Sequence, residues 1–394
     1  MRLQPDRLLT KRVDPLVMKT LNAIELLELI RTNGPVSRAQ LATRSRLSKP
    51  TVSDQVDSLI SRSLVMEAGP GNAGIRGGKK PTLLEFNCGY GQILSADIGP
   101  EWMRFAAADL CGNFLIREQL ATTPEKGARA VVRTLKRGLE DLLARVPEAN
   151  IRVISVAVPG IVDVRQGVVL ETDNVFGWRD VKLTEELSKE FDLPVRIDND
   201  VNMAALAELS AGSAPDNFVF IRLHTGIGSA VVLGGELHHG AHWAAGEIGH
   251  MLLDIRALDA EANPRGYLES VVGQDRVRER IRKLARRGGR TGAEQQAAGD
   301  VALHLGSAIA NIASVYDPEA IILLGEPFGA VLDEIRRVTR KLVPWPVEIR
   351  LSKLGEDAAL HGALAAGLNH AFGQIARTLQ TVAAGQVALT AAQT

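Results

Sequence analysis

The hydrophobic and polar positions of the first 90 residues predict three short helices followed by two strands. Apolar residues recur at helical spacing over residues 18–31 and 38–44, and a third helix is expected to begin after Ser48, a residue type that caps helices. Two apolar strands are expected at residues 64–67 and 83–86, on either side of a glycine-rich segment that carries basic residues. This order of elements is typical of a winged helix-turn-helix, which is a DNA-binding fold.

The third predicted helix has one apolar face and one face of short polar side chains, which suit contacts to base edges. The basic loop between the two strands suits phosphates or the minor groove. The alternative is a small helical bundle that contacts another protein. The residues predicted to contact DNA are Ser37, Arg38, Arg44, Arg46, Ser48, Lys49, Thr51, Ser53, Asp54, Gln55, Arg76, Lys79 and Lys80.

From residue 92 onward, apolar runs of strand length alternate with amphipathic helices. Strands are expected at residues 93–98, 153–158 and 219–223, and helices at residues 126–146 and 301–316, among others. The order of elements recurs, which predicts two α/β lobes with a cleft between them.

This change of pattern predicts two domains. A winged helix-turn-helix is expected over residues 1–88, and an α/β effector domain over residues 89–394. One lobe of the effector domain should span about residues 89–212 together with the C-terminal helix, and the other about residues 213–355.

The charge distribution supports a nucleic-acid-binding first domain. The net charge of the chain is zero, but residues 1–90 hold 14 basic and 8 acidic residues, and the remainder holds 32 basic and 38 acidic residues. A basic first quarter on an acidic protein suggests a module for a polyanion, and chance variation of the surface is the alternative.

The remaining composition indicates a globular cytoplasmic protein. No apolar run approaches the roughly 20 residues that span a membrane, and the first residues lack the pattern of a secretory signal. The two cysteines, Cys88 and Cys111, are therefore expected to be packing residues in a reducing compartment.

Several short segments of the effector domain carry a resemblance to a known family. They are Val-Pro-Gly-Ile-Val-Asp at residues 158–163, Asp-Asn-Asp-Val-Asn at 198–202, Gly-Glu-Ile-Gly-His at 246–250, Gly-Tyr-Leu-Glu at 266–269 and Tyr-Asp-Pro-Glu at 316–319. In these segments the chain resembles the ROK family (repressors, open reading frames and kinases), whose regulators carry an N-terminal winged helix-turn-helix. The resemblance implies an actin-like, sugar-kinase-like (ribonuclease H-like) ATPase fold for the effector domain.

The resemblance also implies a set of sugar-binding residues in the cleft. Sugar hydroxyls are donors and acceptors at once, so carboxylates, amides and imidazoles suit them. Two of the matching residues, Asn199 and Asp200, also precede a predicted helix, so helix capping is a competing role for both. The matching positions are Asn174, Asn199, Asp200, Glu247, His250 and Glu269.

The family's phosphate-binding turns are altered in this sequence. The aspartate that matches Asp200 is the general base of the kinases. The first turn, Asp-x-Gly-Gly-Thr in the family, is Asp-Ile-Gly-Pro-Glu at residues 97–101, where Pro100 removes a backbone donor and Glu101 adds a negative charge. The second turn, Gly-Thr-Gly-x-Gly-x-Gly, is His-Thr-Gly-Ile-Gly-Ser-Ala at residues 224–230. These changes predict that the protein does not use ATP.

Zinc is not predicted either. Many family members place three zinc-binding cysteines after the Gly-His pair, and the matching residues here are Ala260, Ala262 and Tyr267. Packing by Leu258 and Tyr267 is expected to replace the metal. A local histidine cluster, either a metal site or an exposed polar loop, is formed by His238, His239 and His242.

Together these inferences predict a sugar-responsive transcriptional regulator, a repressor of carbohydrate-utilisation genes. It should bind double-stranded operator DNA as a homodimer or higher homo-oligomer, and a small sugar effector should modulate it without being phosphorylated. No cofactor and no membrane contact are expected, and the location should be the bacterial cytoplasm. The alternatives are an ATP-dependent sugar kinase with an accessory DNA-binding module, and a regulator whose cleft binds no ligand.

Overall fold

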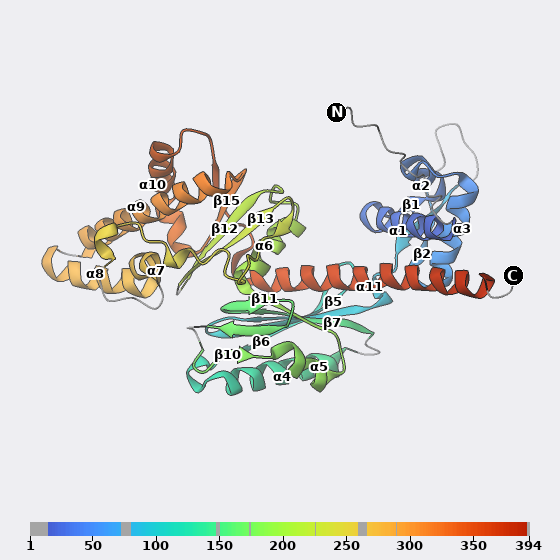
Figure 1. The fold of residues 1–394 in the computed structure, drawn as a ribbon, viewed down its shortest axis with the longest axis horizontal. Coiled ribbons are helices and arrows are strands. Elements are labelled where there is room, and N and C mark those ends of the chain that lie inside the picture. The colour runs from blue at the N-terminus through green and yellow to red at the C-terminus, as the bar shows by residue number, and fades with distance from the viewer. Residues whose placement is uncertain are drawn as a thin grey trace, which may run out of the picture. The chain divides into compact units, whose positions relative to one another are not determined.

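The chain forms two compact units (Figure 1). The first comprises Met1–Gln92, Asp109–Asn113 and Leu368–Thr394, and the second Ile93–Ala108 and Phe114–Gly367. The first unit therefore includes a turn and part of the C-terminal helix that the sequence pattern assigned to the effector domain. The structure, a computed structural model, describes residues 15–71, 80–146, 150–172, 175–224, 226–258, 266–288 and 290–391.

The N-terminal part of the first unit has the elements of a winged helix-turn-helix. Its antiparallel sheet has the strand order β1-β3-β2. The predicted wing, residues 71–81, is called the wing segment, and most of it lies outside the described residues. Val52, Val56 and Leu59 of α3 are buried where this helix contacts α1 and α2. The bounds are α1 (Pro15–Asn33), β1 (Val36–Ser37), α2 (Arg38–Ser45), α3 (Lys49–Ser61), β2 (Val65–Pro70) and β3 (Thr82–Phe86).

The second unit is built on two five-stranded sheets, and we call each sheet with its helices a lobe. The sheet of the first lobe has the order β11-β7-β4-β5-β6, and α4 (Ala128–Arg145) and α5 (Leu183–Phe191) run along one of its faces (Figure 1). Its strands are β4 (Gln92–Ile98), β5 (Trp102–Asp109), β6 (Phe114–Ala121), β7 (Ile151–Val158) and β11 (Val195–Asn199). A small antiparallel sheet follows β7 and contains β8 (Ile161–Asp163), β9 (Val168–Glu171) and β10 (Arg179–Val181).

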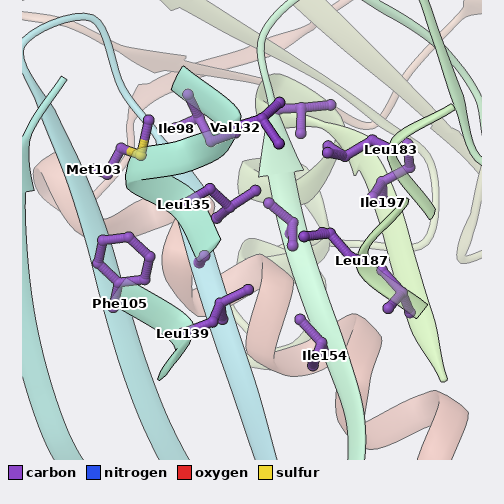
Figure 2. Close-up of a cluster of buried hydrophobic side chains, with 14 of the residues drawn as sticks. Ile98, Met103, Phe105, Val132, Leu135, Leu139, Ile154, Leu183, Leu187 and Ile197 are labelled. Atoms are coloured by element: carbon purple, nitrogen blue, oxygen red, sulfur yellow. The ribbon is translucent and has the colours of Figure 1, made fainter. Parts of the chain in front are cut away.

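Apolar side chains fill the space between the first sheet and its helices. Figure 2 shows Leu135 and Leu139 of α4 and Leu187 of α5 facing Phe105 and Ile154 of the strands. All five side chains are fully buried, and each contributes about 1.5–3 kcal/mol relative to an exposed position. The amphipathic period of α4 thus determines which of its faces meets the sheet.

The sheet of the second lobe has the order β14-β13-β12-β15-β16. One face is covered by α7 (Tyr267–Val272), α9 (Arg290–Tyr316) and α10 (Glu326–Leu342), while α8 (Gln274–Gly288) packs on α9. The strands are β12 (Phe218–Leu223), β13 (Ile227–Leu233), β14 (Glu236–Leu237), β15 (Ala320–Leu324) and β16 (Glu348–Leu351).

Two helices, α6 (Asp200–Ser210) and the first part of α11 (Ala358–Ala391), lie between the lobes. Val201 of α6 packs on the second sheet, whereas Met203 packs against Ala157 of the first sheet and against α11. Gly362 of α11 approaches the Met203 backbone so closely that any Cβ would overlap it. This close packing fixes the N-terminus of α6, which carries two of the predicted sugar ligands. The two lobes of strands and helices confirm the predicted α/β fold class.

A disulfide in the first unit corrects one expectation. Cys88, which follows β3, is bonded to Cys111 in the turn between β5 and β6, with a Cα–Cα distance of 5.1 Å. The Leu110 N–H donates a hydrogen bond to the Cys88 carbonyl at 3.0 Å and holds the two segments together. The composition alone indicated packing thiols, because a pairing across 23 residues depends on the strands that bring the segments together.

Within the described residues, no helix combines the length and the apolar character that a membrane span requires.

Candidate functional site

A cavity of about 350 Å³ lies in the second unit, and residues of both lobes form its wall. Residues from both predicted phosphate turns line this cavity together with the predicted sugar ligands. Of the six predicted sugar ligands, Asn174 lies outside the described residues. The other five, all in the cavity wall, are Asn199, Asp200, Glu247, His250 and Glu269.

Asn199 is the N-cap of α6, so the competing role that the sequence suggested is present. Its Oδ1 accepts hydrogen bonds from the Val201 and Asn202 amides at 2.8 and 3.1 Å, and its Nδ2 donates to the Gly160 carbonyl at 2.8 Å. Asn199 therefore uses most of its hydrogen-bonding capacity to join α6 to the segment after β7. Its contact with a sugar stays a prediction.

Asp200, at the position of the kinase base, forms an ion pair with Arg222 of β12. Asp200 Oδ2 and Arg222 Nη1 are 2.8 Å apart, and the side chains are only 20% and 11% exposed. Burial raises the pKa of Asp200, and the charge of Arg222 opposes this shift. Arg222 was not predicted as a site residue, although an arginine inside the apolar run Phe-Val-Phe-Ile-Arg-Leu indicates a buried partner.

Gly266 explains how His250 and Glu269 come to line the same cavity. This glycine starts α7 with φ +82°, and a Cβ would overlap Gly249 and His250 of the short 3-10 helix Ile248–His250. Because only glycine tolerates both the conformation and the close approach, α7 packs directly on that helix. Glu269 lies on α7 and faces the cavity beside His250.

Backbone donors of the two predicted phosphate turns already have protein partners. The Gly99 N–H donates to the Trp102 carbonyl at 3.1 Å, and Pro100 has no N–H. In the second turn, the Ile227 N–H donates to Glu269 Oε2 at 3.0 Å. Such turns bind phosphate through free backbone N–H groups. A nucleotide would have to displace these internal bonds.

Asp97, at the start of the first turn, is a buried carboxylate with incomplete compensation. It is 1% exposed, Arg104 Nη1 lies 3.4 Å from its Oδ2, and its Oδ1 has no hydrogen-bond partner among the described residues. Burial raises the pKa of Asp97 to about 6, although Arg222 and Arg104 favour the charged form. Ionisation of this carboxyl is therefore less favourable in the folded protein than in the unfolded chain.

The predicted histidine cluster does not act as one group. His239 Nε2 lies 2.8 Å from Asp198 Oδ2, at the end of β11, whereas His238 and His242 are exposed. Among the residues that the structure describes, no three His, Cys, Asp or Glu side chains are grouped so as to hold a metal ion. The absence of zinc stays a prediction, since Ala260 and the residues around it are not described.

The two residues expected to stabilise the loop near Ala260 differ. Tyr267 packs on His304, with its hydroxyl 3.4 Å from His304 Nε2. Leu258 is 68% exposed, so the expectation that it packs in place of a metal is wrong.

In the first unit, four of the predicted DNA contacts lie on α3 and are exposed or half-buried. Lys49 and Asp54 are exposed, Thr51 and Ser53 are half-buried, and Ser48 Oγ caps the helix by accepting the Thr51 N–H at 3.3 Å. Others, Arg44, Arg46 and Lys80, are exposed as well. Arg76 and Lys79 lie outside the described residues.

Arg38, also predicted to contact phosphate, ties α2 to α3. Its guanidinium donates to Asp57 Oδ1 at 2.7 Å and to Ser53 Oγ at 2.9 Å. The hydrogen bond from Arg38 lowers the pKa of Asp57. Arg38 thus has a structural role within the helix-turn-helix.

Two of the predicted DNA contacts are corrected. Gln55 is 4% exposed because it follows Val52 by one turn and lies on the stripe that packs inward. Ser37 is also 4% exposed, and it forms a capping box in which its Oγ accepts the Gln40 N–H and its own N–H donates to Gln40 Oε1. Neither side chain is free to reach DNA.

Two family models match the chain. The model of the ROK family matches residues 93–369, and the model of the MarR family matches residues 19–67. The first match falls mainly on the unit that holds the cavity, and the second falls on the helices that include α3.

Similar individual proteins include regulators that match almost the whole chain and an enzyme that matches about two thirds of it. A putative xylose repressor from Caldicellulosiruptor sp. is 29% identical over 387 residues, which cover 89% of this chain and 96% of that protein. A glucokinase from Halalkalibacterium halodurans is 26% identical over 310 residues, which cover 68% of this chain and 92% of the enzyme. A solved ROK family transcriptional regulator, a homolog of the E. coli MLC protein, has a TM-score of 0.73 at 22% identity and covers 91% of this chain and 98% of its own.

Proposed function

The chain belongs to the ROK family, and we propose that it is a sugar-responsive transcriptional repressor of carbohydrate-utilisation genes. It binds operator DNA through α3 and the wing segment, and it binds a small sugar in the cavity between its lobes. One observation carries the proposal. The chain has both a helix α3 with exposed polar residues and a cavity lined by the predicted sugar ligands, in which Asp200 is paired with Arg222.

The DNA-binding role is supported by both sequence and surface. The MarR family match covers α2, α3 and α1 from residue 19 onward, and the exposed cations Arg44, Arg46 and Lys49 lie on or beside α2 and α3. Cations of this kind neutralise backbone phosphates, and short polar groups of α3 suit the major groove. The relative named putative xylose repressor supports repression as the outcome.

Binding without phosphorylation is supported by the contacts around the cavity. Asp200 Oδ2 is already paired with Arg222, the Ile227 N–H is taken by Glu269, and Pro100 has no donor to offer. Phosphoryl transfer depends on positioning and charge stabilisation of the phosphates, so it needs these donors. We therefore propose that ATP is not a substrate and that zinc and other cofactors are not required.

The sugar acts by favouring one arrangement of the lobes. Ligand residues come from both lobes, since Asn199 lies on the first and Glu247 and Glu269 on the second. A sugar shifts an equilibrium only if it binds one conformation more tightly. We propose that the protein is a homodimer whose two winged helices contact two half-sites, and that the sugar weakens this arrangement.

Fluorescence anisotropy with DNA from the region upstream of the protein's own gene tests the regulatory role. We expect sequence-preferring, salt-sensitive binding that at least one sugar of a panel weakens by about 5-fold or more. The control is the same duplex with a scrambled sequence. Binding that is equally strong to both duplexes and indifferent to every sugar would contradict the proposal.

A sugar kinase with an accessory DNA-binding module is the second candidate, because the general-base aspartate is retained and a glucokinase is among the relatives. Coupled detection of ADP release over the same sugar panel distinguishes the two. We expect no sugar-dependent turnover. Turnover that Asp200→Asn abolishes would replace the regulator proposal by the kinase.

A further inference from the structure

A loop of the second lobe contacts the first lobe beside the predicted sugar ligands. The loop, residues 238–246, follows β14 and leads directly into Glu247. His239 Nε2 lies 2.8 Å from Asp198 Oδ2, and the guanidinium carbon of Arg165 lies 5.4 Å from the centre of the Trp243 ring. The loop therefore joins the two lobes at two points, and the first is an ion pair whenever His239 is protonated.

The Asp198 carboxylate is shared between this loop and the start of α6. Its Oδ1 accepts hydrogen bonds from the Asn199 N–H at 2.7 Å and from Asn202 Nδ2 at 2.9 Å. Asp198 is 8% exposed, and a carboxylate with so little water contact depends on such donors. Loss of the His239 bond would leave Oδ2 uncompensated and loosen the segment that carries Asn199 and Asp200.

The other end of the loop is fixed to β13. The Ser229 N–H and Oγ both donate to the Gly246 carbonyl, at 3.1 and 2.8 Å. Gly246 has φ +94°, and a Cβ there would overlap the Ser229 carbonyl, so only glycine fits. The His239 and Trp243 rings pack edge to face with their centres 5.7 Å apart. The loop is thus a compact connection between the Asp198 contact and the second sheet.

We infer that His239 is a positioning residue whose bond to Asp198 holds the sugar ligands of the second lobe in register with those of the first. The inference rests on the proposed sugar-binding function of the cavity. A ligand that contacts two walls binds more tightly when the walls are already held at the binding distance. Asp198 also raises the pKa of His239, chiefly through their hydrogen bond and against the effect of burial, so the pair is charged over a wider pH range.

Calorimetric titration of the full-length protein with aldopentoses, aldohexoses and N-acetylhexosamines tests this role. His239→Ala removes the bond, His239→Gln keeps an N–H donor at similar reach, and His242→Ala changes an exposed histidine of the same loop as the matched control. For the sugar that binds the wild type, we expect the affinity to fall about 10- to 100-fold in His239→Ala. It should return to within about 3-fold in His239→Gln, and His242→Ala should match the wild type.

Thermal unfolding without sugar separates positioning from stability. We expect the melting temperature of His239→Ala to lie within about 3 °C of the wild type. Wild-type affinity in His239→Ala would overturn the inference and leave the proposed function intact. An equal loss of affinity and melting temperature in both His239 variants would assign a structural role instead and would also overturn it. A wild-type protein that binds no sugar of the panel would overturn the proposed function and the inference together.

Discussion

We call the part of the cavity wall with Glu247, His250 and Glu269 the sugar side and the two altered phosphate turns the phosphate side, and the two sides differ in how exposed their polar groups are. On the sugar side, Glu247 and His250 are exposed in the cavity wall. On the phosphate side, the amides of Gly99 and Ile227 donate to protein acceptors, and Pro100 has no amide hydrogen. The contrast supports the proposal that the cavity takes a sugar without a nucleotide, because the protein's own acceptors occupy donors that phosphates would need.

The largest effect is expected at Asp97, the buried carboxylate at the start of the first phosphate turn. Its folded pKa of about 6 lies above its ordinary value of 3.8, so the folded state binds the proton more tightly. The contribution of Asp97 to the free energy of unfolding is therefore highest below pH 3.8, falls as pH rises toward 6 and stays reduced above it. Asp97→Asn should stabilise the protein by up to about 3 kcal/mol at pH 7 and by little at pH 4.

Urea unfolding at the two pH values measures this effect, and sugar affinity should stay within about 3-fold of the wild type. Asp141→Asn, at an exposed position of α4, serves as the control. A destabilised Asp97→Asn protein at pH 7 would mean that the ionised carboxylate is needed, and the contrast between the two sides would break down.

On the sugar side, Glu269→Ala should lower sugar affinity by about 100-fold, because hydroxyl groups of the bound sugar lose a charged acceptor. The change also releases the Ile227 N–H. Calorimetry with the sugar that binds the wild type gives the measurement, and Glu294→Ala at an exposed position of α9 is the control. An affinity within about 3-fold of the wild type would place the sugar elsewhere.

A substitution in the first unit should affect DNA binding and leave sugar binding unchanged, and its effect should be smaller than that of Glu269→Ala. Lys49→Ala should weaken DNA binding several-fold and reduce the salt dependence by about one phosphate contact, while sugar affinity stays unchanged. Anisotropy titrations over a salt series provide the slope. Lys189→Ala, exposed on α5, should leave both unchanged. An unaltered slope in Lys49→Ala would argue against α3 as the DNA-contacting helix.

The smallest effect is expected from restoring the family's first phosphate turn. Pro100→Gly combined with Glu101→Thr should change sugar affinity by less than about 2-fold and should not produce ADP release, because Arg222 still holds Asp200 and Glu269 still occupies the second turn. Sugar-dependent ADP release by this double variant would show that the first turn alone separates the regulator from a kinase.

Periodicity predicted several elements closely because their apolar stripes are clear. The helix expected at residues 126–146 is α4, and the strand expected at 153–158 lies within β7 (Ile151–Val158). Three helices of the described part of the chain were not predicted. The six-residue α7 is too short to show a helical period. The arginine-rich α8 has few apolar positions to show a stripe, and α10 begins with Glu326-Pro327 directly after β15, where a proline usually indicates a turn.

Residues of the site likewise divide into those that a short motif reveals and those whose role depends on a distant partner. The motif at residues 246–250 could be recognised from the sequence because this short segment resembles the ROK family in its own residues. The roles of Arg222 and His239 were not predicted, because their partners lie 22 and 41 residues away and are brought close by the strand order. Gln55 was misplaced because polarity alone does not show where α1 packs on α3.

The sequence by itself determined the two-part architecture, the family and the residue types that surround the cavity, since these depend on local periodicity and short motifs. Tertiary structure alone decided which polar groups are still available to a ligand. Availability depends on hydrogen-bond partners that are distant along the chain, as for Asp200 with Arg222 and Ile227 with Glu269. A buried donor or acceptor is satisfied by whatever the fold places beside it, and sequence spacing does not encode that neighbour.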